Sequence, residues 1–189
     1  MNVVVTGGTG VLGSCVVDGL VAAGHQVRVL SRDPSRASVA TSGMNLLRGD
    51  LRDPASLHEA LSSAEVVVHC ASDVRSAHDV DVAGTANLLG VLHGLEVAHL
   101  VYVSIVDVDR IPLKYYRAKR EVEVMIESQG VPWTIQRATQ FHPFIETMLT
   151  ASARRVQMLM ASARRAHWKV RQRREHRHPP TEGRRCRKR

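Results

Sequence analysis

The chain has 189 residues, 44% of them hydrophobic, and a formal net charge of +8, which fits one globular domain with its own core and is short for two. Its three cysteines lack the spacing of metal ligands, which argues against a zinc site or a disulfide framework and favours the reducing cytoplasm. We expect neither a secretion leader nor a membrane span, because the sequence begins with a strand pattern and no apolar run is long enough to cross a bilayer.

The positive charge is concentrated at one end of the chain. Residues 151–189 contain 14 Lys or Arg and 2 acidic residues, a net charge of +12. Of the totals of 26 basic and 18 acidic residues, this leaves 12 basic and 16 acidic residues in 1–150, a net charge of −4. We therefore predict a folded domain over residues 1–150 and an Arg-rich tail over residues 151–189, helical at first and then without a fold of its own.

Apolar runs alternate with helical patterns from residue 2 to about residue 137, as in repeated strand–helix–strand units. Short connections between such units give right-handed crossovers, so we predict an α/β fold with a doubly wound parallel sheet, a Rossmann fold of three α/β/α layers. We expect Gly24 and Gly130 to end helices, and Asp53 with Pro54 to begin one. The predicted strands are 2–6, 26–31, 44–48, 65–70, 98–104 and 132–137, and the predicted helices are 11–23, 35–41, 54–62, 80–94, 114–129 and 141–168.

The first strand leads into a glycine-rich turn that opens the first helix. A dinucleotide pyrophosphate binds N–H groups at a helix N-terminus and approaches them so closely that a Cβ atom would clash. We expect Gly7 and Gly8 to form the tight turn, Gly10 to face the pyrophosphate, and Gly13 to let the helix pack against the sheet. Such turns also occur without a ligand, but the strand before and the amphipathic helix after favour a cofactor site. Its predicted residues are Gly7, Gly8, Thr9, Gly10, Val11, Leu12 and Gly13.

The residues after the second strand bear on the kind of dinucleotide. Ser31 and Arg32 offer the donors that a 2′-phosphate needs, and we add Arg36 to them. Asp33 offers the alternative, since a carboxylate here can accept the free ribose hydroxyl of NAD(H). A surface arginine at a strand end is also common without such a role. We expect NADP(H) as the cofactor, with NAD(H) as the alternative.

The next two strand ends contribute further candidate contacts. Asp50 and Leu51 follow the third strand, where they can reach the adenine; alternatively, Asp50 only caps a turn. His69, at the end of the fourth strand, is equally compatible with a packed core histidine and with a functional one. The small residues after it permit the chain to pass beneath the nicotinamide ribose; they are Cys70, Ala71 and Ser72.

The strongest catalytic candidate is the pair Tyr115 and Lys119. The two residues lie four apart on a predicted helix and share a face, which brings an ammonium close to a phenol. A nearby cation lowers the pKa of tyrosine, so that Tyr115 can act as acid or base near neutral pH, and Lys119 can also hold the nicotinamide ribose. The spacing also occurs by chance on solvated helix faces, but this pair lies at the edge of the sheet where the cofactor is expected.

Three more residues are candidates at the same edge. Ser104 closes the fifth strand, where its hydroxyl either binds a substrate carbonyl or only caps the strand. Arg137 and His142 follow the sixth strand and can face a substrate cleft, although Arg137 has the alternative of pairing with an acidic neighbour. We expect no metal site, and the predicted catalytic set is Tyr115, Lys119 and Ser104.

Five motifs of the chain occur together in one family. They are Thr-Gly-Gly-Thr-Gly-Val-Leu-Gly at 6–13, Gly-Asp-Leu at 49–51, Tyr-Val-Ser at 102–104, Tyr-x-x-x-Lys at 115–119 and Pro-Trp-Thr-Ile-Gln-Arg-Ala-Thr-Gln-Phe-His at 132–142. In combination they resemble the atypical short-chain dehydrogenase/reductases of the NmrA-like, NAD(P)H-binding kind, over about residues 1–150. The resemblance implies a Rossmann domain, NADP(H) or NAD(H), and either reduction of a small substrate or redox sensing without turnover.

Two features depart from the family pattern. Members with a Ser-Tyr-Lys triad often have the active serine one or two residues beyond the fifth strand, where this chain has Ile105 and Val106. Members also continue with elements that build the substrate pocket, whereas the Arg-rich tail follows here, so cofactor binding should be better preserved than turnover. We expect an NAD(P)H-dependent oxidoreductase acting on a small carbonyl, hydroxyl or related substrate, with a non-catalytic NmrA-like redox sensor as the alternative.

The role of the basic tail over residues 151–189 has more than one interpretation. Its 14 basic side chains would fit nucleic acid or anionic lipid, but Trp168 is its only aromatic residue, so base stacking has no support. A tail without an evolved role, arising from a frameshift or a truncation, is the simpler interpretation. We expect the dinucleotide and a small molecule as partners, and the sequence leaves the oligomeric state open.

Overall fold

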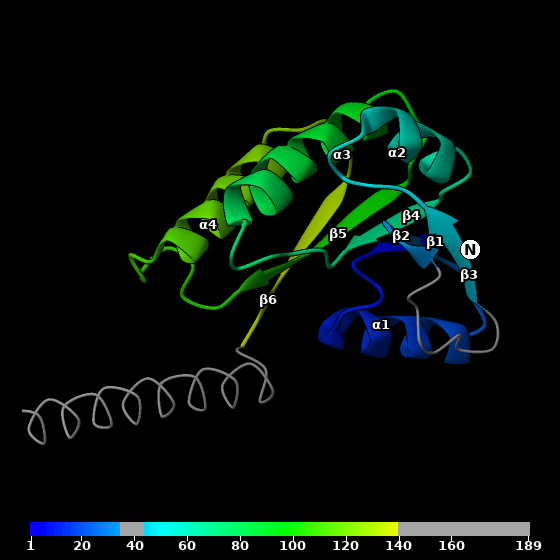
Figure 1. Ribbon diagram of the computed structural model, residues 1–189, viewed down its shortest axis with the longest axis horizontal. Helices are drawn as coiled ribbons and strands as arrows, with labels where there is room; N and C mark the ends of the chain where they lie inside the picture. The colour runs from blue at the N-terminus through cyan, green and yellow to red at the C-terminus, as the bar shows by residue number, and fades with distance from the viewer. Residues whose placement is uncertain (35–43, 140–189) are drawn as a thin grey trace, which may run out of the picture. The chain divides into compact units, whose positions relative to one another are not determined.

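The structure is a computed structural model in which residues 1–34 and 44–139 are described (Figure 1). These residues form a six-stranded sheet in the order β3-β2-β1-β4-β5-β6, with every neighbouring pair parallel. The strands are β1 (Asn2–Thr6), β2 (Gln26–Ser31), β3 (Met44–Arg48), β4 (Val66–His69), β5 (His99–Ile105) and β6 (Trp133–Ala138). The helices are α1 (Val11–Ala22), α2 (Pro54–Leu61), η2 (His78–Ala83), α3 (Gly84–Leu92) and α4 (Lys114–Glu127).

From β1 the chain adds β2 and β3 on one side, and it then returns to add β4, β5 and β6 on the other side of β1. The order of the strands therefore reverses between β1 and β4, which lie side by side. This strand order is that of the Rossmann fold, so the predicted doubly wound parallel sheet is confirmed. Because all strands run the same way, their carboxyl ends meet at one edge of the sheet. In folds of this type a ligand binds outside that edge, at the point where the order reverses.

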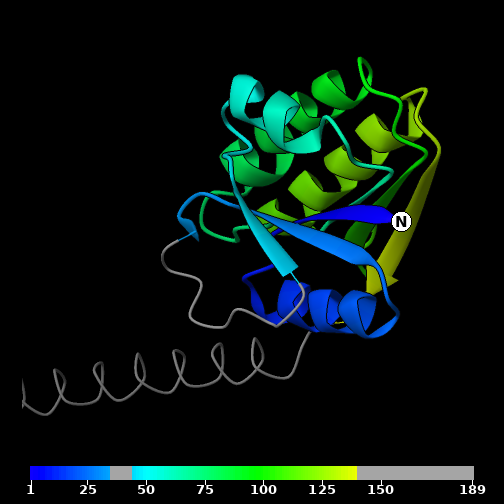
Figure 2. The same ribbon diagram turned by 90° about the vertical axis from the view of Figure 1, so that its right-hand side faces the viewer.

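Helices cover both faces of the sheet (Figure 2). α1 packs on one face, where Val17 joins a core with Val3 and Val29. α2, α3 and α4 lie on the opposite face and bury a larger core that includes Leu88 and Val122. The valines of β1 supply both cores, because successive side chains of a strand point to opposite faces.

The six predicted strands are confirmed to within one residue at each end. The predicted helix 80–94 is divided in the structure: residues 78–83 form a π-helical segment, and the α-helix begins at Gly84. α4 ends at Glu127, ahead of the expected stop at Gly130. The predicted helices 35–41 and 141–168, and the predicted domain boundary at residue 150, lie outside the described residues.

Two helix boundaries follow the expected local chemistry. Asp53 caps α2 by accepting a hydrogen bond from the Ala55 N–H at 3.1 Å, and Pro54 occupies the first turn. Gly24 follows α1 with a φ of +80°, in the left-handed region that favours glycine. Both predictions are confirmed.

The first turn of α1 lies directly on the loop that follows β1. A Cβ added to Gly13 would be 2.1 Å from the Gly7 carbonyl oxygen and 2.7 Å from Gly8 Cα. Non-bonded atoms do not approach so closely, and backbone atoms have little freedom to move away. The close packing expected of Gly13 is therefore confirmed, and the surface it packs on is the loop backbone.

We predict that Gly13→Ala lowers the free energy of unfolding by about 1–3 kcal/mol, because the added methyl group must displace backbone. Gly19→Ala is the matched control, since it lies on the same helix with nothing within 4 Å of the added Cβ. Its better helix propensity should raise stability by up to about 1 kcal/mol. Urea unfolding measures both variants, and equal stabilities would contradict the packing argument.

Candidate functional site

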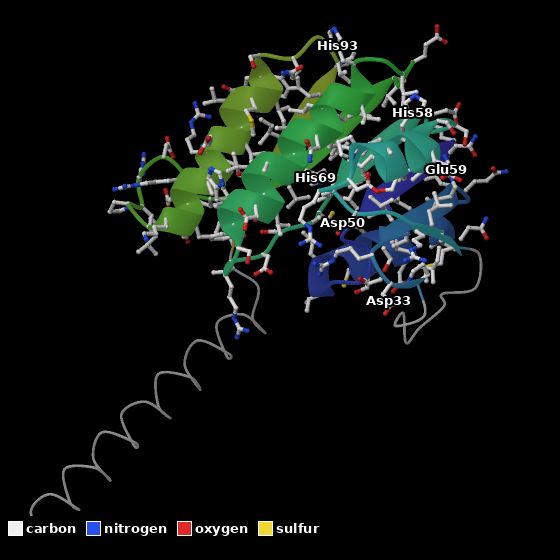
Figure 3. The ribbon with its side chains drawn as sticks, turned by 45° about the horizontal axis from the view of Figure 1, so that its top comes forward. Asp33, Asp50, His58, Glu59, His69 and His93 are labelled. Carbon is white, nitrogen blue, oxygen red and sulfur yellow. The ribbon has the colours of Figure 1, made fainter. Side chains whose placement is uncertain are left out.

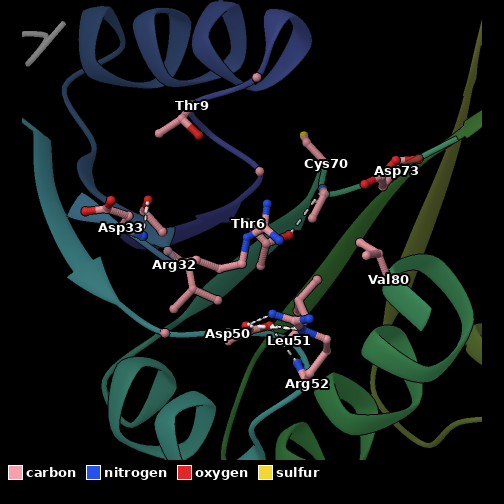
Figure 4. A pocket seen from close by; sticks show the side chains of 17 residues that line it. Thr6, Thr9, Arg32, Asp33, Asp50, Leu51, Arg52, Cys70, Asp73 and Val80 are labelled. Carbon is pink, nitrogen blue, oxygen red and sulfur yellow. Dashed lines mark hydrogen bonds and ion pairs between the residues drawn. The ribbon is translucent and has the colours of Figure 1, made fainter. Parts of the chain in front are cut away.

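A cleft of about 660 Å³ opens at the carboxyl ends of the strands, a volume typical of ligand sites (Figure 4). It is lined by the loop after β1, the end of β2 and the segments after β3 and β4. Four predicted residues belong to the glycine turn and the start of α1 without lining the cleft, namely Gly8, Val11, Leu12 and Gly13. The predicted cofactor residues that line it are Gly7, Thr9, Gly10, Ser31, Arg32, Asp50, Leu51, Cys70, Ala71 and Ser72.

The loop after β1 has the form of a phosphate cradle. Gly7 has a φ of +70°, and a Cβ there would lie 2.6 Å from Ala71 Cα in the segment after β4. Gly10 is the N-cap residue of α1, and no side chain caps this helix. The first N–H groups of α1 therefore have no side-chain acceptor, which is the arrangement that binds a phosphate.

Ser31, Arg32 and Asp33 line the cleft at the end of β2. The Asp33 N–H donates a hydrogen bond to Ser31 Oγ at 3.3 Å. The cleft thus has a hydroxyl, a guanidinium and a carboxylate at the position that distinguishes the two dinucleotides. Arg36, the third residue predicted there, lies outside the described residues.

Asp50 is bound by Arg52, a cleft residue that the sequence analysis missed. Arg52 Nη2 lies 2.6 Å from Asp50 Oδ2, and the Arg52 N–H donates to Oδ1 at 3.0 Å (Figure 4). Hydrogen bonding to Arg52 holds the pKa of the Asp50 carboxyl below its ordinary value, and the more distant charge of Arg32 acts in the same sense. The Asp50 carboxylate therefore caps the turn that it begins, which was the alternative to a contact with adenine. The same residue also lines the cleft.

His69 is a packed core histidine with 0% of its surface exposed (Figure 3). Its Nδ1 is 2.6 Å from Thr6 Oγ1, its Nε2 is 2.9 Å from Thr85 Oγ1, and its ring stacks on Tyr102. Burial, aided by the charge of Lys119, lowers the pKa of His69 to about 3. The ring is therefore neutral near neutral pH, and the structure supports the structural alternative.

Tyr115 and Lys119 are connected through two residues from other parts of the chain. The Tyr115 hydroxyl is 3.0 Å from Ser72 Oγ, which is exposed in the cleft. Ser72 donates to Asp81 Oδ1 at 2.7 Å, and Lys119 Nζ lies 3.1 Å from the same oxygen. Asp81 and Lys119 are both buried. We call these four residues the Asp81 network.

The expectation that Lys119 lowers the pKa of Tyr115 is wrong. Burial raises the pKa of Tyr115 above its ordinary value, although the hydrogen bond with Ser72 acts in the opposite sense. Lys119 Nζ lies 5.8 Å from the centre of the Tyr115 ring, and it contacts Asp81 and the Val103 carbonyl oxygen at 3.4 Å. Burial also lowers the pKa of Lys119, against the influence of Asp81. The ammonium is directed at a carboxylate and not at the phenol oxygen.

Ser104 faces α4 and not the cleft. It is 4% exposed and lies on the same side of β5 as Leu100 and Tyr102, which belong to the core beneath that helix. Its hydroxyl oxygen is buried and has no hydrogen-bond partner among the described residues. The neighbouring carboxylate of Glu123 is bound by Arg137, and this hydrogen bonding outweighs burial and lowers the pKa of Glu123. The structure therefore does not bring Ser104 to the cleft with Ser72.

Arg137 pairs with acidic neighbours, as its simpler alternative proposed. Its Nη2 lies 2.7 Å from Glu123 Oε2, and its Nη1 lies 3.7 Å from Asp109 Oδ1. These contacts tie β6 to α4 and to the loop after β5. His142, the other candidate for a substrate cleft, lies outside the described residues.

Asp81 is the main functional candidate that the sequence analysis missed. It stands between Val80 and Val82 at the start of the predicted helix 80–94. Burying a carboxylate is costly unless a donor or cation faces it. An acidic residue on the apolar side of a helical pattern was the available signal, and it points to a buried partner such as Lys119.

Other kinds of chemistry have little support in the described part of the chain. Cys70 lines the cleft, but burial raises the pKa of its thiol to about 11, which disfavours the reactive thiolate. Within residues 1–34 and 44–139, His, Cys, Asp and Glu form no cluster that would hold a metal ion. None of the helices in those ranges is long and apolar enough to cross a membrane.

Comparison with known proteins gives a consistent picture. A protein-family model described as NAD(P)H-binding matches residues 7–166. A Streptomyces griseus protein, (4-alkanoyl-5-oxo-2,5-dihydrofuran-3-yl)methyl phosphate reductase, is 34% identical over 141 residues, which are 74% of this chain and 48% of the relative. The chain spans about half the length of the curated relatives it matches first.

Two solved structures have the same architecture. UDP-glucose 4-epimerase of Thermus thermophilus in complex with NAD is 27% identical, with a TM-score of 0.63 over 72% of this chain and 54% of that one. The NADPH-dependent quinone oxidoreductase of Escherichia coli complexed with NADPH is 25% identical, with a TM-score of 0.64 over 71% of this chain and 48% of that one.

We predict that His69 makes the protein less stable as the solution becomes acidic. The unfolded state binds a proton at this ring near pH 6.5 and the folded state only near pH 3, so the free energy of unfolding falls across this window. From about pH 7 to about pH 5, His69 should account for a loss of about 2 kcal/mol. Urea unfolding at both pH values should show a smaller loss for His69→Gln, and an equal loss would contradict a neutral buried ring.

Proposed function

Because the chain belongs to the NAD(P)H-binding family of the short-chain dehydrogenase/reductase type, NmrA-like in its motifs, we propose that it is an NAD(P)H-dependent reductase of a small carbonyl or related substrate. One observation carries this proposal: Ser72, which lines the same cleft as the glycine loop, hydrogen-bonds the Tyr115 hydroxyl. The proposed proton donor is therefore one hydrogen bond away from the proposed cofactor cleft. The reductase named in Streptomyces griseus supports the same kind of chemistry.

The residues of the cleft fit a nicotinamide dinucleotide. The pyrophosphate is proposed to bind at the uncapped start of α1, beside Gly7 and Gly10. A side chain at Gly7 would strike the segment after β4, so the turn depends on glycine. We assign the adenosine end to the side of Asp50, and the nicotinamide end to the side of Ser72, nearest Tyr115.

We propose NADP(H) in preference to NAD(H). Ser31 and Arg32 line the cleft at the end of β2, and Arg52 lies across the Asp50 turn. Hydroxyl and guanidinium donors suit a 2′-phosphate, whereas Asp33 is the feature that would suit a free hydroxyl. Two guanidinium groups at this end of the cleft favour the phosphate.

The bound cofactor supplies a hydride, and the chain supplies the proton. We assign proton donation to the Tyr115 hydroxyl, which is held by Ser72 at 3.0 Å. Lys119 is assigned to the nicotinamide ribose and to the charge balance of Asp81. Ser104 has no assigned role in the reaction, because it is buried and does not line the cleft.

The alternative is a protein of the NmrA-like kind that binds the dinucleotide as a redox sensor without turnover. One observation favours it: Ser104 does not line the cleft. For either function we propose a cytoplasmic location, in keeping with the free thiols of Cys15 and Cys70.

Tyr115→Phe should reduce kcat by about 10²- to 10⁴-fold, because the proton donor is lost while the ring remains. NADPH affinity should stay within about twofold, since Tyr115 is assigned no contact with the phosphates. The measurement is NADPH consumption with a panel of carbonyl substrates, together with NADPH binding to the same preparations.

The matched control is Tyr116→Phe, which removes the neighbouring hydroxyl from a ring that packs with Ile105 and Val108. It should retain turnover. Equal losses in the two variants would contradict the assignment of Tyr115. A wild-type chain that binds NADPH but reduces no substrate of the panel would contradict the reductase and favour the sensor.

Arg32→Ala should weaken NADPH binding by about tenfold and leave NADH binding unchanged, because only the first cofactor offers a 2′-phosphate to the guanidinium. Titration of cofactor fluorescence with increasing protein measures both affinities. Equal weakening of the two cofactors would contradict the preference for NADP(H).

A further inference from the structure

Both oxygens of the Asp50 carboxylate are engaged by one neighbouring residue. Arg52 Nη2 donates to Oδ2 at 2.6 Å, and Arg52 Nε lies 3.0 Å from Oδ1 and 3.2 Å from Oδ2 (Figure 4). The backbone N–H of Arg52 also donates to Oδ1, at 3.0 Å. A carboxylate has about four lone-pair sites for hydrogen bonds, so these contacts leave it little capacity for another donor.

The charge of Asp50 is balanced within the same pair. Hydrogen bonding to Arg52 holds the pKa of the Asp50 carboxyl below its ordinary value, and hydrogen bonding to Asp50 raises the pKa of Arg52. The two side chains are therefore an ionised carboxylate and a guanidinium in direct contact. Together they offer the cleft a planar unit without net charge.

Arg52 is the member of the pair that is more open to the cleft. Both residues line it, but the Arg52 side chain is 59% exposed and the Asp50 side chain 28%. Nη1 of Arg52 is not among the atoms that contact Asp50, so it stays available to a ligand. A ligand at this end of the cleft consequently meets a guanidinium that is held in a fixed orientation.

The two side chains would recognise a purine base in different ways. A free carboxylate accepts a hydrogen bond from the 6-amino group of adenine and repels a base that carries an oxygen at this position. A guanidinium stacks on the flat face of an aromatic ring, and every base has such a face. The first contact reads the substituent at C6, whereas the second does not.

Adenine has little to gain by displacing Arg52 from Asp50. The existing hydrogen bonds join two charged groups, whereas the 6-amino group is a neutral donor, and bonds between charged partners are the stronger ones. The guanidinium is also held close by the chain, since Arg52 lies two residues from Asp50 and its backbone N–H binds the same carboxylate. The pair is therefore expected to persist when a nucleotide binds.

We propose that Arg52 masks Asp50 from the base of the bound dinucleotide, so that the cleft binds a purine without reading its substituent at C6. This inference rests on the proposed function and defines the specificity of its adenosine end. The site then accepts nicotinamide dinucleotides with a 6-amino or a 6-oxo purine. Arg52 is the residue that determines this tolerance, and the direct contact of the Asp50 carboxylate with adenine expected from the sequence is absent.

The test compares NADPH with its reduced hypoxanthine analogue, in which an oxygen replaces the 6-amino group. Nicotinamide fluorescence, titrated with the full-length wild-type chain, measures the two dissociation constants. We expect them to agree within about threefold. A larger preference for either base would overturn the proposal, and this result needs no variant.

Arg52→Ala uncovers the carboxylate. NADPH should then bind about tenfold more tightly than the hypoxanthine analogue, because Asp50 accepts the amino group and repels the oxygen. The ratio of the two affinities is the readout, since loss of the guanidinium changes both affinities together. Arg110→Ala is the matched control: it also removes an arginine from an exposed pair with an aspartate, and it does not line the cleft. An unchanged ratio in Arg52→Ala, or the same change in Arg110→Ala, would overturn the proposal.

Asp50→Asn, added to Arg52→Ala, assigns the new preference to the carboxylate. The amide offers a donor or an acceptor depending on its orientation, so the two affinities should again agree within about threefold. Its oxygen can still accept the backbone N–H of position 52, which retains the turn. A preference for adenine that persists in the double variant would overturn the proposal.

Failure of this inference and failure of the proposed function give different results. A chain that binds neither NADPH nor NADH contradicts the proposed function. A wild-type chain that binds NADPH and discriminates strongly against the hypoxanthine analogue contradicts the masking by Arg52 alone.

Discussion

The structure depends on how closely the start of α1 can approach the loop after β1. Gly13 lies on the backbone of Gly7 and Gly8, and Gly7 in turn lies against Ala71 in the segment after β4. These contacts bring the N-terminus of α1 to the carboxyl edge of the sheet, beside the two central strands. A cofactor cradle follows from this approach, because Gly7, Thr9 and the N-cap residue Gly10 then line the cleft at the start of the helix.

The second half of the site is reached through Ser72, which follows β4. Its hydroxyl contacts Tyr115 on α4 and Asp81 on η2. The carboxylate in turn binds Lys119, one turn along α4 from Tyr115. Elements that are far apart in the chain thus meet around Ser72, beside the cleft.

The fold could be predicted from the sequence because its signals are local. Valine-rich runs mark strands buried on both faces, and the Asp53 cap, Pro54 and Gly24 mark helix ends. The Tyr115–Lys119 pair could also be predicted from the sequence, since a spacing of four residues defines a shared helix face. The π-helical segment that begins at His78 has no such periodic signature, and it divided the predicted helix 80–94.

The chemistry of the site was harder to predict because it depends on distant residues. The sequence places Lys119 near Tyr115 but does not show that Asp81, 38 positions earlier, binds the ammonium. For that reason the prediction that Lys119 lowers the pKa of Tyr115 was wrong. Ser104 was assigned to the cleft from its position at the end of β5, whereas strand alternation turns it toward α4. Ser72 was chosen for its small size, and its hydroxyl proved to be the link.

The central claim is that the loop after β1 and the segment after β4 hold a nicotinamide dinucleotide. Its most direct test is a calorimetric titration of the folded full-length chain with NADPH and, separately, with NADH. The account predicts saturable binding of one NADPH per chain, with NADH weaker. Absence of binding heat for both cofactors at about millimolar concentration, where even a weak complex would form, would contradict it.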